Sequence, residues 1–320
     1  MLTTSHNTPP APSLAAPVRT PSSAEPPWHE PDVVTRRFAG LTVHAVRSGF
    51  VACKEAHRTL SVPDFLRLPA IVLDRRWTEW MPVTSYVIEH PEGVFVVDPG
   101  QREETADAET LDCDPGTRWF YRHQLRLAFR SEERIDRRLL ALGLDPRGVR
   151  GVVVTHRHGD HADALSVLGT EAAYVGARDW PTHQGALPAH WPAALAPTLV
   201  DGEGPTIDGL AGARPVTRDE RVCVVPLFGH SPGHLGLLAR AEDGTRVLFA
   251  GDAVFSLAQL RRGEIAGICE EPRDARATLR ALDGLLGAHR TFLLPAHERE
   301  ALDRLAAGTP ASETVALPAT

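Results

Sequence analysis

The sequence Thr-His-Arg-His-Gly-Asp-His, at residues 155–161, is the stretch that decides the fold of this chain. It follows the apolar run Gly-Val-Val-Val at 151–154, which predicts a buried strand, and it precedes residues 162–168, whose pattern predicts the start of a helix. The strand therefore delivers three imidazoles and a carboxylate into one tight turn. Structural histidines seldom cluster with an aspartate at a strand end, so a histidine-rich surface loop is the less favoured interpretation.

The four polar side chains of this turn have the spacing and the chemistry of metal ligands. His156 and His158 lie two residues apart, so both side chains point to the same side of an extended chain. Asp160 and His161 follow where the chain bends into the helix, which lets them face back toward the same point. Neutral imidazole and carboxylate are the groups that Zn²⁺ and similar divalent ions prefer, so we expect a metal site at this turn.

The pattern His-x-His-x-Asp-His resembles the signature of the metallo-β-lactamase-fold hydrolases, and the resemblance extends over roughly residues 40–305. It implies an α/β fold of four layers, the αβ/βα sandwich, in which two mixed sheets face each other and helices cover the outside. The metal ions of such a fold lie at one edge, where strand ends from both halves meet. The alternation of expected strands and helices along this chain fits that arrangement.

Three further polar residues follow expected strands in the order that the resemblance requires, namely His230, Asp252 and His297. The resemblance implies two divalent metal ions, with zinc expected and iron, manganese or cobalt as alternatives. By this resemblance the first ion binds His156, His158 and His230, the second binds Asp160, His161 and His297, and Asp252 bridges the two.

Two more residues are expected beside the ligands rather than among them. The hairpin of strands 83–90 and 94–97 ends at Asp98; by resemblance this aspartate lies beneath the metal site, and the alternative is a simple turn residue. His234 comes four residues after His230 and begins the next expected strand, so we expect it to pack against the site without binding metal.

The composition excludes some partners and leaves others open. The formal net charge of -7 gives no general affinity for phosphate backbones, and no apolar run is long enough to cross a bilayer, so neither nucleic acid nor a membrane is expected as a partner. A small-molecule substrate is expected, and a homodimer stays open. The four cysteines lie far apart in the sequence, which favours reduced thiols and a cytoplasmic location.

The sequence pattern divides the chain into one domain and two tails. Residues 1–31 are rich in Pro, Ser, Thr and Ala without periodic apolar positions, which predicts a disordered tail rather than a secretory signal. Residues 32–308 carry the expected hydrolase domain, and residues 309–320 predict a short C-terminal tail. His183 and His190 fall in a part of the domain rich in Pro, Gly and Ala, and we interpret them as surface residues.

Residues 101–130 look like an insertion between the hairpin and the metal strand. Residues 131–142, which follow it, predict a helix that begins at a serine cap. The second part of the insertion, residues 119–129, is aromatic and basic, and it either caps the active site or packs a helix on the core. Phe120 and Tyr121 in this part are candidate substrate contacts, together with Phe255 after the bridging aspartate.

The expected ligands make up a hydrolytic centre. Two ions that share one water lower its pKa toward neutrality, so a metal-bridging hydroxide is the expected nucleophile. Asp160 can accept a proton as well as bind metal, so we expect it to pass a proton to the leaving group. Asp160 and Asp252 are therefore the candidate catalytic residues. This chemistry serves hydrolysis of an ester, lactone, thioester or amide and does not choose among them.

Looser motifs resemble the N-acyl-homoserine-lactone lactonases of this fold, which are quorum-quenching enzymes. The similarity lies in residues 81–93, in the aromatic insertion, and in residues 251–255 followed by 263–267. One position departs from the pattern: many such lactonases carry a tyrosine three residues after the bridging aspartate, and this chain has Phe255. Either Tyr121 substitutes for the missing hydroxyl or the substrate differs. The leading prediction is an enzyme that opens a lactone or a related ester.

Other functions of the same fold remain as alternatives. A thioesterase resembling glyoxalase II is the second prediction, because its motif after the bridging aspartate often ends in Phe; no clear basic helical domain follows here. An RNA-processing nuclease is disfavoured by the acidic balance, and a β-lactamase by the expected cytoplasmic location. From another class, a catalytically silent metal-binding protein is disfavoured because degenerate members usually lose ligands and none is lost here.

Overall fold

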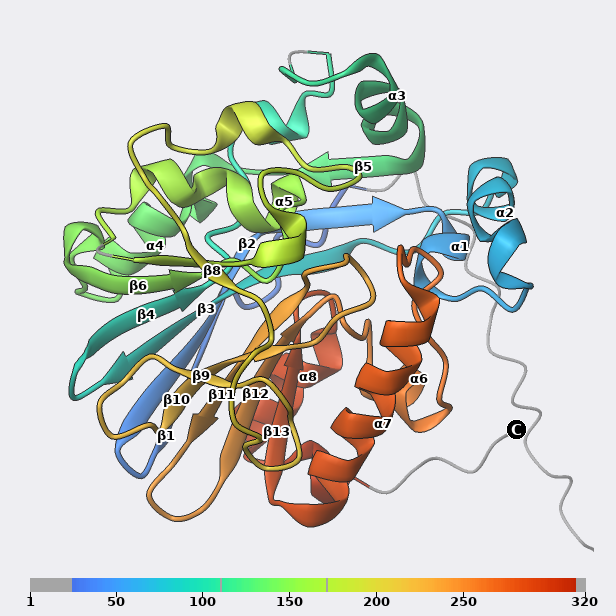
Figure 1. Ribbon diagram of the computed structural model, residues 1–320. Helices are drawn as coiled ribbons and strands as arrows, with labels where there is room; N and C mark the ends of the chain where they lie inside the picture. The colour runs from blue at the N-terminus through green and yellow to red at the C-terminus, as the bar shows by residue number, and fades with distance from the viewer. Residues whose placement is uncertain (1–24, 110, 171, 315–320) are drawn as a thin grey trace, which may run out of the picture.

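Two β-sheets lie face to face, and helices cover their outer faces (Figure 1). The computed structural model describes residues 25–109, 111–170 and 172–314. In the larger sheet α4 packs on the outer side through Ile135 and Leu139, and in the smaller sheet α7 does so through a stripe of leucines. The four-layer αβ/βα sandwich predicted from the sequence is confirmed.

The larger sheet has eight strands in the order β1-β2-β3-β4-β6-β7-β8, with β5 paired to β2 beside this path, and the smaller sheet has five in the order β13-β12-β11-β10-β9. The strands of the larger sheet are β1 (Val33–Phe38), β2 (Leu41–Cys53), β3 (Met81–His90), β4 (Gly93–Val97), β5 (Leu125–Ala128), β6 (Val149–Val153), β7 (Ala173–Gly176) and β8 (Thr198–Val200). Those of the smaller sheet are β9 (Arg214–Pro215), β10 (Val222–Pro226), β11 (Leu235–Arg240), β12 (Arg246–Gly251) and β13 (Thr291–Pro295).

The helices are mostly short and join the strands on the outside of the sandwich. They are α1 (Glu55–Arg58), α2 (Arg67–Leu73), α3 (Pro115–Gln124), α4 (Ile135–Ala141), α5 (Gly159–Ala162), α6 (Leu257–Arg261), α7 (Pro272–Ala288) and α8 (Arg299–Ala307). Asp114 caps α3 by accepting hydrogen bonds from the next turn, with a proline at the first helical position.

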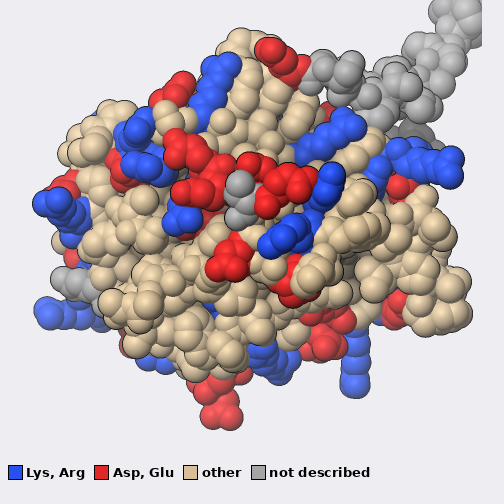
Figure 2. Space-filling model, turned by 90° about the horizontal axis from the view of Figure 1, so that it is seen from above, with Lys and Arg blue, Asp and Glu red and all other residues tan. Residues whose placement is uncertain are grey.

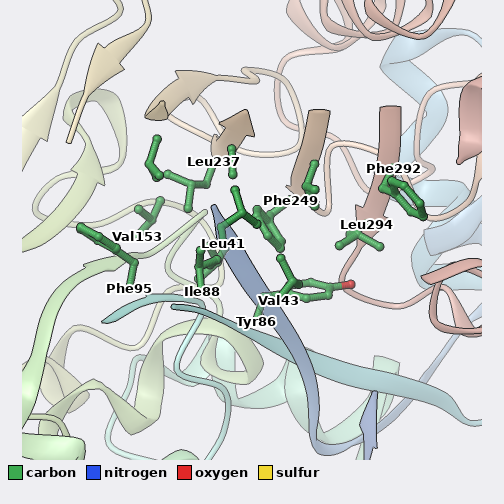
Figure 3. Packing of buried hydrophobic residues seen from close by; sticks show 14 of the residues in the cluster. Leu41, Val43, Tyr86, Ile88, Phe95, Val153, Leu237, Phe249, Phe292 and Leu294 are labelled. Atoms are coloured by element: carbon green, nitrogen blue, oxygen red, sulfur yellow. The ribbon is translucent and has the colours of Figure 1, made fainter. Parts of the chain in front are cut away.

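The space between the sheets is filled by apolar side chains from both of them (Figure 3). Alternate residues of β2, β3 and β4 point inward, as the two-residue period of a strand requires, and they meet residues of β11, β12 and β13. The Tyr86 ring packs at a tilt against Phe249, with ring centroids 5.1 Å apart, and its hydroxyl donates a hydrogen bond to the Pro295 carbonyl. This core holds the strand ends of both sheets in a fixed relation.

Parallel pairing brings the site-bearing strand ends together. β4 pairs in parallel with β6, so the residues that follow them, Asp98 and Thr155, lie side by side. β12 pairs in parallel with β13, so Asp252 and His297 follow adjacent strands at the same edge. The chain thus delivers ligands from both sheets to one end of the sandwich.

Two expected helices differ from the structure. The helix expected at 131–142 begins as a 3-10 turn, Ser131–Glu133, and continues as α4 only after an extended Arg134. The break has a physical reason: Glu133 turns inward and its carboxylate accepts a hydrogen bond from the buried Arg47 guanidinium at 2.8 Å. The helix expected at 162–168 is the short α5 followed by the 3-10 turn Asp163–Val167.

Much of the two expected tails, residues 1–24 and 315–320, lies outside the described residues. Next to them, Trp28 packs edge-on against Phe50 with ring centroids 5.2 Å apart, and Ala311 is buried beside the smaller sheet. The tail boundaries stay predictions. No helix in the described part of the chain combines the length and apolar character needed to span a membrane.

Candidate metal centre

Three imidazoles converge on one point at the end of β6; we call His156, His158 and His230 the three-histidine set. His156 Nε2 lies 2.8 Å from His158 Nδ1, and His230 Nε2 lies 3.2 and 3.3 Å from these two nitrogens. Nitrogens bound at 2.0–2.1 Å to one tetrahedral ion lie about 3.3 Å apart. The spacing of the three nitrogens is therefore that of a metal site.

A second group, the mixed set, consists of Asp160, His161 and His297. Asp160 Oδ2 lies 3.7 Å from His161 Nε2 and 3.5 Å from His297 Nε2. Burial disfavours the charged form of His161, but Asp252, Asp160 and Asp98 outweigh it and raise the pKa of this imidazole to about 10. The same concentration of negative charge favours a bound cation.

Asp252 lies between the two sets. Its Oδ1 is 3.4 Å from His161 Nε2 and 3.3 Å from His297 Nε2, whereas its Oδ2 is 3.7 Å from His230 Nε2. Each carboxylate oxygen thus faces a different set. A tight main-chain turn at Gly251, with φ 51°, places the side chain there.

The unpaired atoms of the centre fit divalent metal ions. His161 Nε2 and Asp252 Oδ1 are buried and have no hydrogen-bond partner among the described residues. Burial lowers the pKa of His158 to about 4 and holds those of His156 and His230 well below the usual range. Imidazoles that stay neutral are in the form that binds metal. All seven residues predicted as ligands are therefore brought together.

The outer nitrogens of the ligand imidazoles are held by hydrogen bonds, which fix each ring and its tautomer. His161 Nδ1 donates to Asp98 Oδ2 at 2.8 Å, and His297 Nδ1 donates to the Pro82 carbonyl at 2.9 Å. Asp98 also accepts from the Thr155 amide and hydroxyl, at 2.7 and 2.8 Å. The structure thus places Asp98 beneath the site, in contact with a ligand.

His234 lies next to the centre but in a different role from the ligands. Its Nε2 accepts a hydrogen bond from the Asp252 amide at 3.1 Å, and its ring stacks on His156 with centroids 5.2 Å apart. The imidazole therefore supports the main chain at Asp252.

An apolar pocket opens beside the two sets, and it contains all three residues predicted as substrate contacts. Phe255 lies parallel to His297 at 5.7 Å, and Phe120 packs on His57 at 5.2 Å. The Tyr121 hydroxyl accepts from the Gly159 amide and donates its proton to the Gly185 carbonyl. The other lining residues, beside ligands, are Val51, Cys53, His57, Met81, Leu125, Gly185 and Ile268.

Residues 119–129 both cover the pocket and join the sheet. Phe120 and Tyr121 on α3 line the pocket, while β5 pairs with β2. Trp119, in contrast, is exposed and stacks on His123. The helical part of the segment thus lies at the pocket, whereas the rest adds a strand to the larger sheet instead of packing a helix on the core.

The interpretation of His183 as a surface residue is wrong. Its side chain is 2% exposed, its Nε2 accepts from the Arg157 amide at 3.0 Å, and its Nδ1 donates to Glu270 Oε1 at 3.1 Å. His190 is also mostly buried and pairs with Asp163 at 2.7 Å. The surrounding residues have no regular secondary-structure period, so the sequence carried no signal that this segment folds over the metal turn.

Two other features were missed from the sequence. His57, on α1, is buried in the pocket wall, and a lone histidine between Ala56 and Arg58 gave no sign of it. A separate group of potential donors, His90, Glu92 and Asp219, lies at the β3–β4 turn. There His90 Nδ1 accepts from the Glu92 amide, so its other nitrogen carries the proton and faces Asp219 at 3.1 Å. The group is thus a contact between an imidazole and a carboxylate.

The αβ/βα sandwich and the clustered donor residues together define a protein of this fold with a metal site at one end of the sheets. The sequence profile of the metallo-beta-lactamase superfamily matches residues 78–297, and the chain belongs to this superfamily. A probable metallo-hydrolase of Mycobacterium tuberculosis is 30% identical over 224 residues, which is 65% of this chain and 65% of that protein. The match thus spans slightly less than two thirds of this relative.

Two lactonases are also similar to the chain. N-acyl homoserine lactonase AttM of Agrobacterium fabrum is 25% identical over 69% of this chain and 83% of its own length. A solved N-acyl homoserine lactone hydrolase with the product N-hexanoyl-L-homoserine at its catalytic metal center aligns with a TM-score of 0.65 at 18% identity, covering 84% of this chain and 95% of that one. At this identity the structural likeness shows the shared fold.

Proposed function

We propose that the chain is a dinuclear metal-dependent hydrolase that opens the lactone ring of an N-acylated substrate. The observation that carries the proposal is the position of Asp252, with one carboxylate oxygen facing the three-histidine set and the other facing the mixed set. Two divalent ions bound there would supply an activated water and polarise the substrate carbonyl. Zinc is the ion we expect.

The chain's own residues have distinct tasks in this reaction. Asp252 and the six other donors fix the spacing of the two sets, and Asp98 orients His161. Asp160 also lines the pocket, and its side chain is 12% exposed, so a substrate can reach its carboxylate. We assign to Asp160 the transfer of a proton to the ring oxygen that leaves when the lactone opens.

The pocket supports an acyl group as part of the substrate. Its walls include Val51, Met81, Phe120, Leu125 and Ile268, which offer apolar contact to a hydrocarbon chain. Named relatives that hydrolyse N-acyl homoserine lactones favour the same substrate class. The predicted substitution of Tyr121 for a donor at position 255 is not favoured, since its hydroxyl proton is engaged by Gly185.

The test is hydrolysis of a homologous series of N-acyl homoserine lactones by the metal-loaded protein. We expect kcat/KM to rise with acyl length, because longer chains cover more of the apolar wall. We also expect Phe255→Tyr to keep its metals and to preserve or raise kcat/KM, since a well-placed donor to the carbonyl is worth roughly 2.7–4 kcal/mol. A flat response to lactones beside fast cleavage of thioesters would overturn the lactonase proposal.

A glyoxalase II-like thioesterase is the second candidate, and Phe255 is the observation that favours it. The acidic side chains gathered on the face seen from above do not favour a nuclease (Figure 2). The cysteines are free thiols, which suits the cytoplasmic location that we expect.

A further inference from the structure

The three-histidine set rests on two irregular segments that contact its outer side. Residues 183–184 reach the metal turn: His158 Nε2 donates to the Gln184 carbonyl at 3.2 Å, and the Arg157 amide donates to His183. With Nε2 of His158 protonated, the lone pair on Nδ1 is the one directed into the set.

Residues 268–270 support the third histidine in the same way. His230 Nδ1 donates to the Ile268 carbonyl at 3.2 Å, which directs the Nε2 lone pair into the set. The Glu270 amide donates to the carbonyl of His230 at 3.1 Å. The ring and the main chain of His230 are therefore both fixed by this second segment.

One side-chain pair joins the two supporting segments. His183 Nε2 accepts from the Arg157 amide, so its Nδ1 carries the proton and donates to Glu270 Oε1 at 3.1 Å. A continuous hydrogen-bonded path thus runs from Arg157, between His156 and His158, through His183 and Glu270 to His230.

The close fit of the chain around this path leaves little room for rearrangement. Gly185 has φ 80°, and a β-carbon there would come within 3.0 Å of His158 Nε2. Asp179 lies just before segment 183–184 and is fully buried. It accepts hydrogen bonds from the Ser231 hydroxyl and the Gly233 amide, both at 2.6 Å, and so ties the chain before this segment to the loop after His230.

We propose that His183 and Glu270 are positioning residues, which set the spacing of the three-histidine set and thereby its metal affinity. Neither residue lines the pocket, and each acts through the segment that holds one of the three histidines. This inference rests on the proposed function, because it takes the three histidines to be metal ligands. Outer partners of this kind typically contribute about 10- to 100-fold to metal affinity.

The experiment is a competition titration of apo-protein with Zn²⁺ against a chromophoric chelator, paired with the visible spectrum of the Co²⁺-loaded protein. We expect Glu270→Ala and His183→Ala each to weaken one of the two metal equivalents by about 10- to 100-fold and to shift the Co²⁺ bands. The double variant should be no weaker than the worse single variant, because both remove the same link. Glu270→Gln, which keeps an acceptor for His183, should recover most of the affinity.

The chain offers a matched control in His44 and Glu89, another histidine–glutamate pair, with 2.9 Å between His44 Nε2 and Glu89 Oε1. Glu89→Ala should leave both equivalents unchanged. The inference is overturned if Glu270→Ala binds both equivalents as wild type does, if it loses both together, or if Glu89→Ala causes the same loss. A wild-type protein that binds no metal overturns the proposed function itself, which separates the two failures.

Discussion

The two halves of the centre are held in different ways. The mixed set is supported from regular strands: Asp98 directly follows β4 and holds His161, and Pro82 within β3 holds His297. In the three-histidine set, His158 and His230 are held by segments 183–184 and 268–270, which belong to no helix or strand. Rigid sheet positions one half, whereas the other depends on side-chain links between loops. The two sets should therefore respond to different substitutions.

Asp252 is the residue that the two sets share, so Asp252→Ala should have the largest effect. Removal of the carboxylate takes away the oxygen that faces each set of imidazoles. We expect metal content and lactone hydrolysis to fall together, the rate by more than about 100-fold, which exceeds the usual effect of outer partners. Elemental analysis and kcat/KM on the same preparation measure this. Normal metal content with a near-normal rate would remove Asp252 from the site.

Asp98→Asn should separate the two sets. Asparagine tolerates the positive φ of 53° at this position, so the turn is kept while the charge behind His161 is lost. We expect the affinity of the mixed set for metal to fall by about 10- to 100-fold. The three-histidine set should lose less, because its His156 reaches Asp98 only through the Thr155 hydroxyl. The competition titration of apo-protein with Zn²⁺ measures this loss of affinity. If Asp98→Asn and Glu270→Ala weakened the same equivalent, the division of supports between the two sets would be wrong.

His234→Ala should have the smallest effect on metal. The change leaves the buried Asp252 amide without its acceptor, which we expect to lower the free energy of unfolding by about 1–3 kcal/mol. Metal content should stay close to that of wild type, because His234 contacts the main chain rather than an ion. Chemical denaturation of the apo-protein and elemental analysis of the loaded protein check the two parts. Loss of metal from His234→Ala with retention in His230→Ala would reverse the assignment of this motif.

The sandwich was predicted because the motif at 155–161 resembles that of the metallo-β-lactamase-fold hydrolases, and the apolar runs that end in polar turns fit the strands of that fold. The strands that carry the ligands, β6, β10, β12 and β13, were placed from such runs, and the resemblance then ordered the residues after them. Asp98 was placed by the same resemblance, at the turn that follows the expected hairpin. The supporting residue next to regular structure could therefore be predicted.

His183 and Glu270 were not found because nothing local marks them. Their segments lack the period of a helix or a strand, and their roles depend on a contact across 87 residues of sequence. The expected helix at 131–142 is broken for a related reason: Glu133 turns inward because its carboxylate accepts a hydrogen bond from Arg47 on β2. Polar contacts between residues far apart in the sequence determine the structure at these positions, and such contacts cannot be predicted from a single sequence.

The parallel pairing of β12 with β13 has a consequence for the order of biosynthesis. The residues of the three-histidine set have all been translated once His230 is added, whereas the mixed set waits for His297. A nascent chain that stops before β13 lacks a donor that only the finished sheet supplies. Metal at the mixed set would therefore stabilise only chains that have been completed and folded, by an amount that grows with the ratio of free ion to dissociation constant.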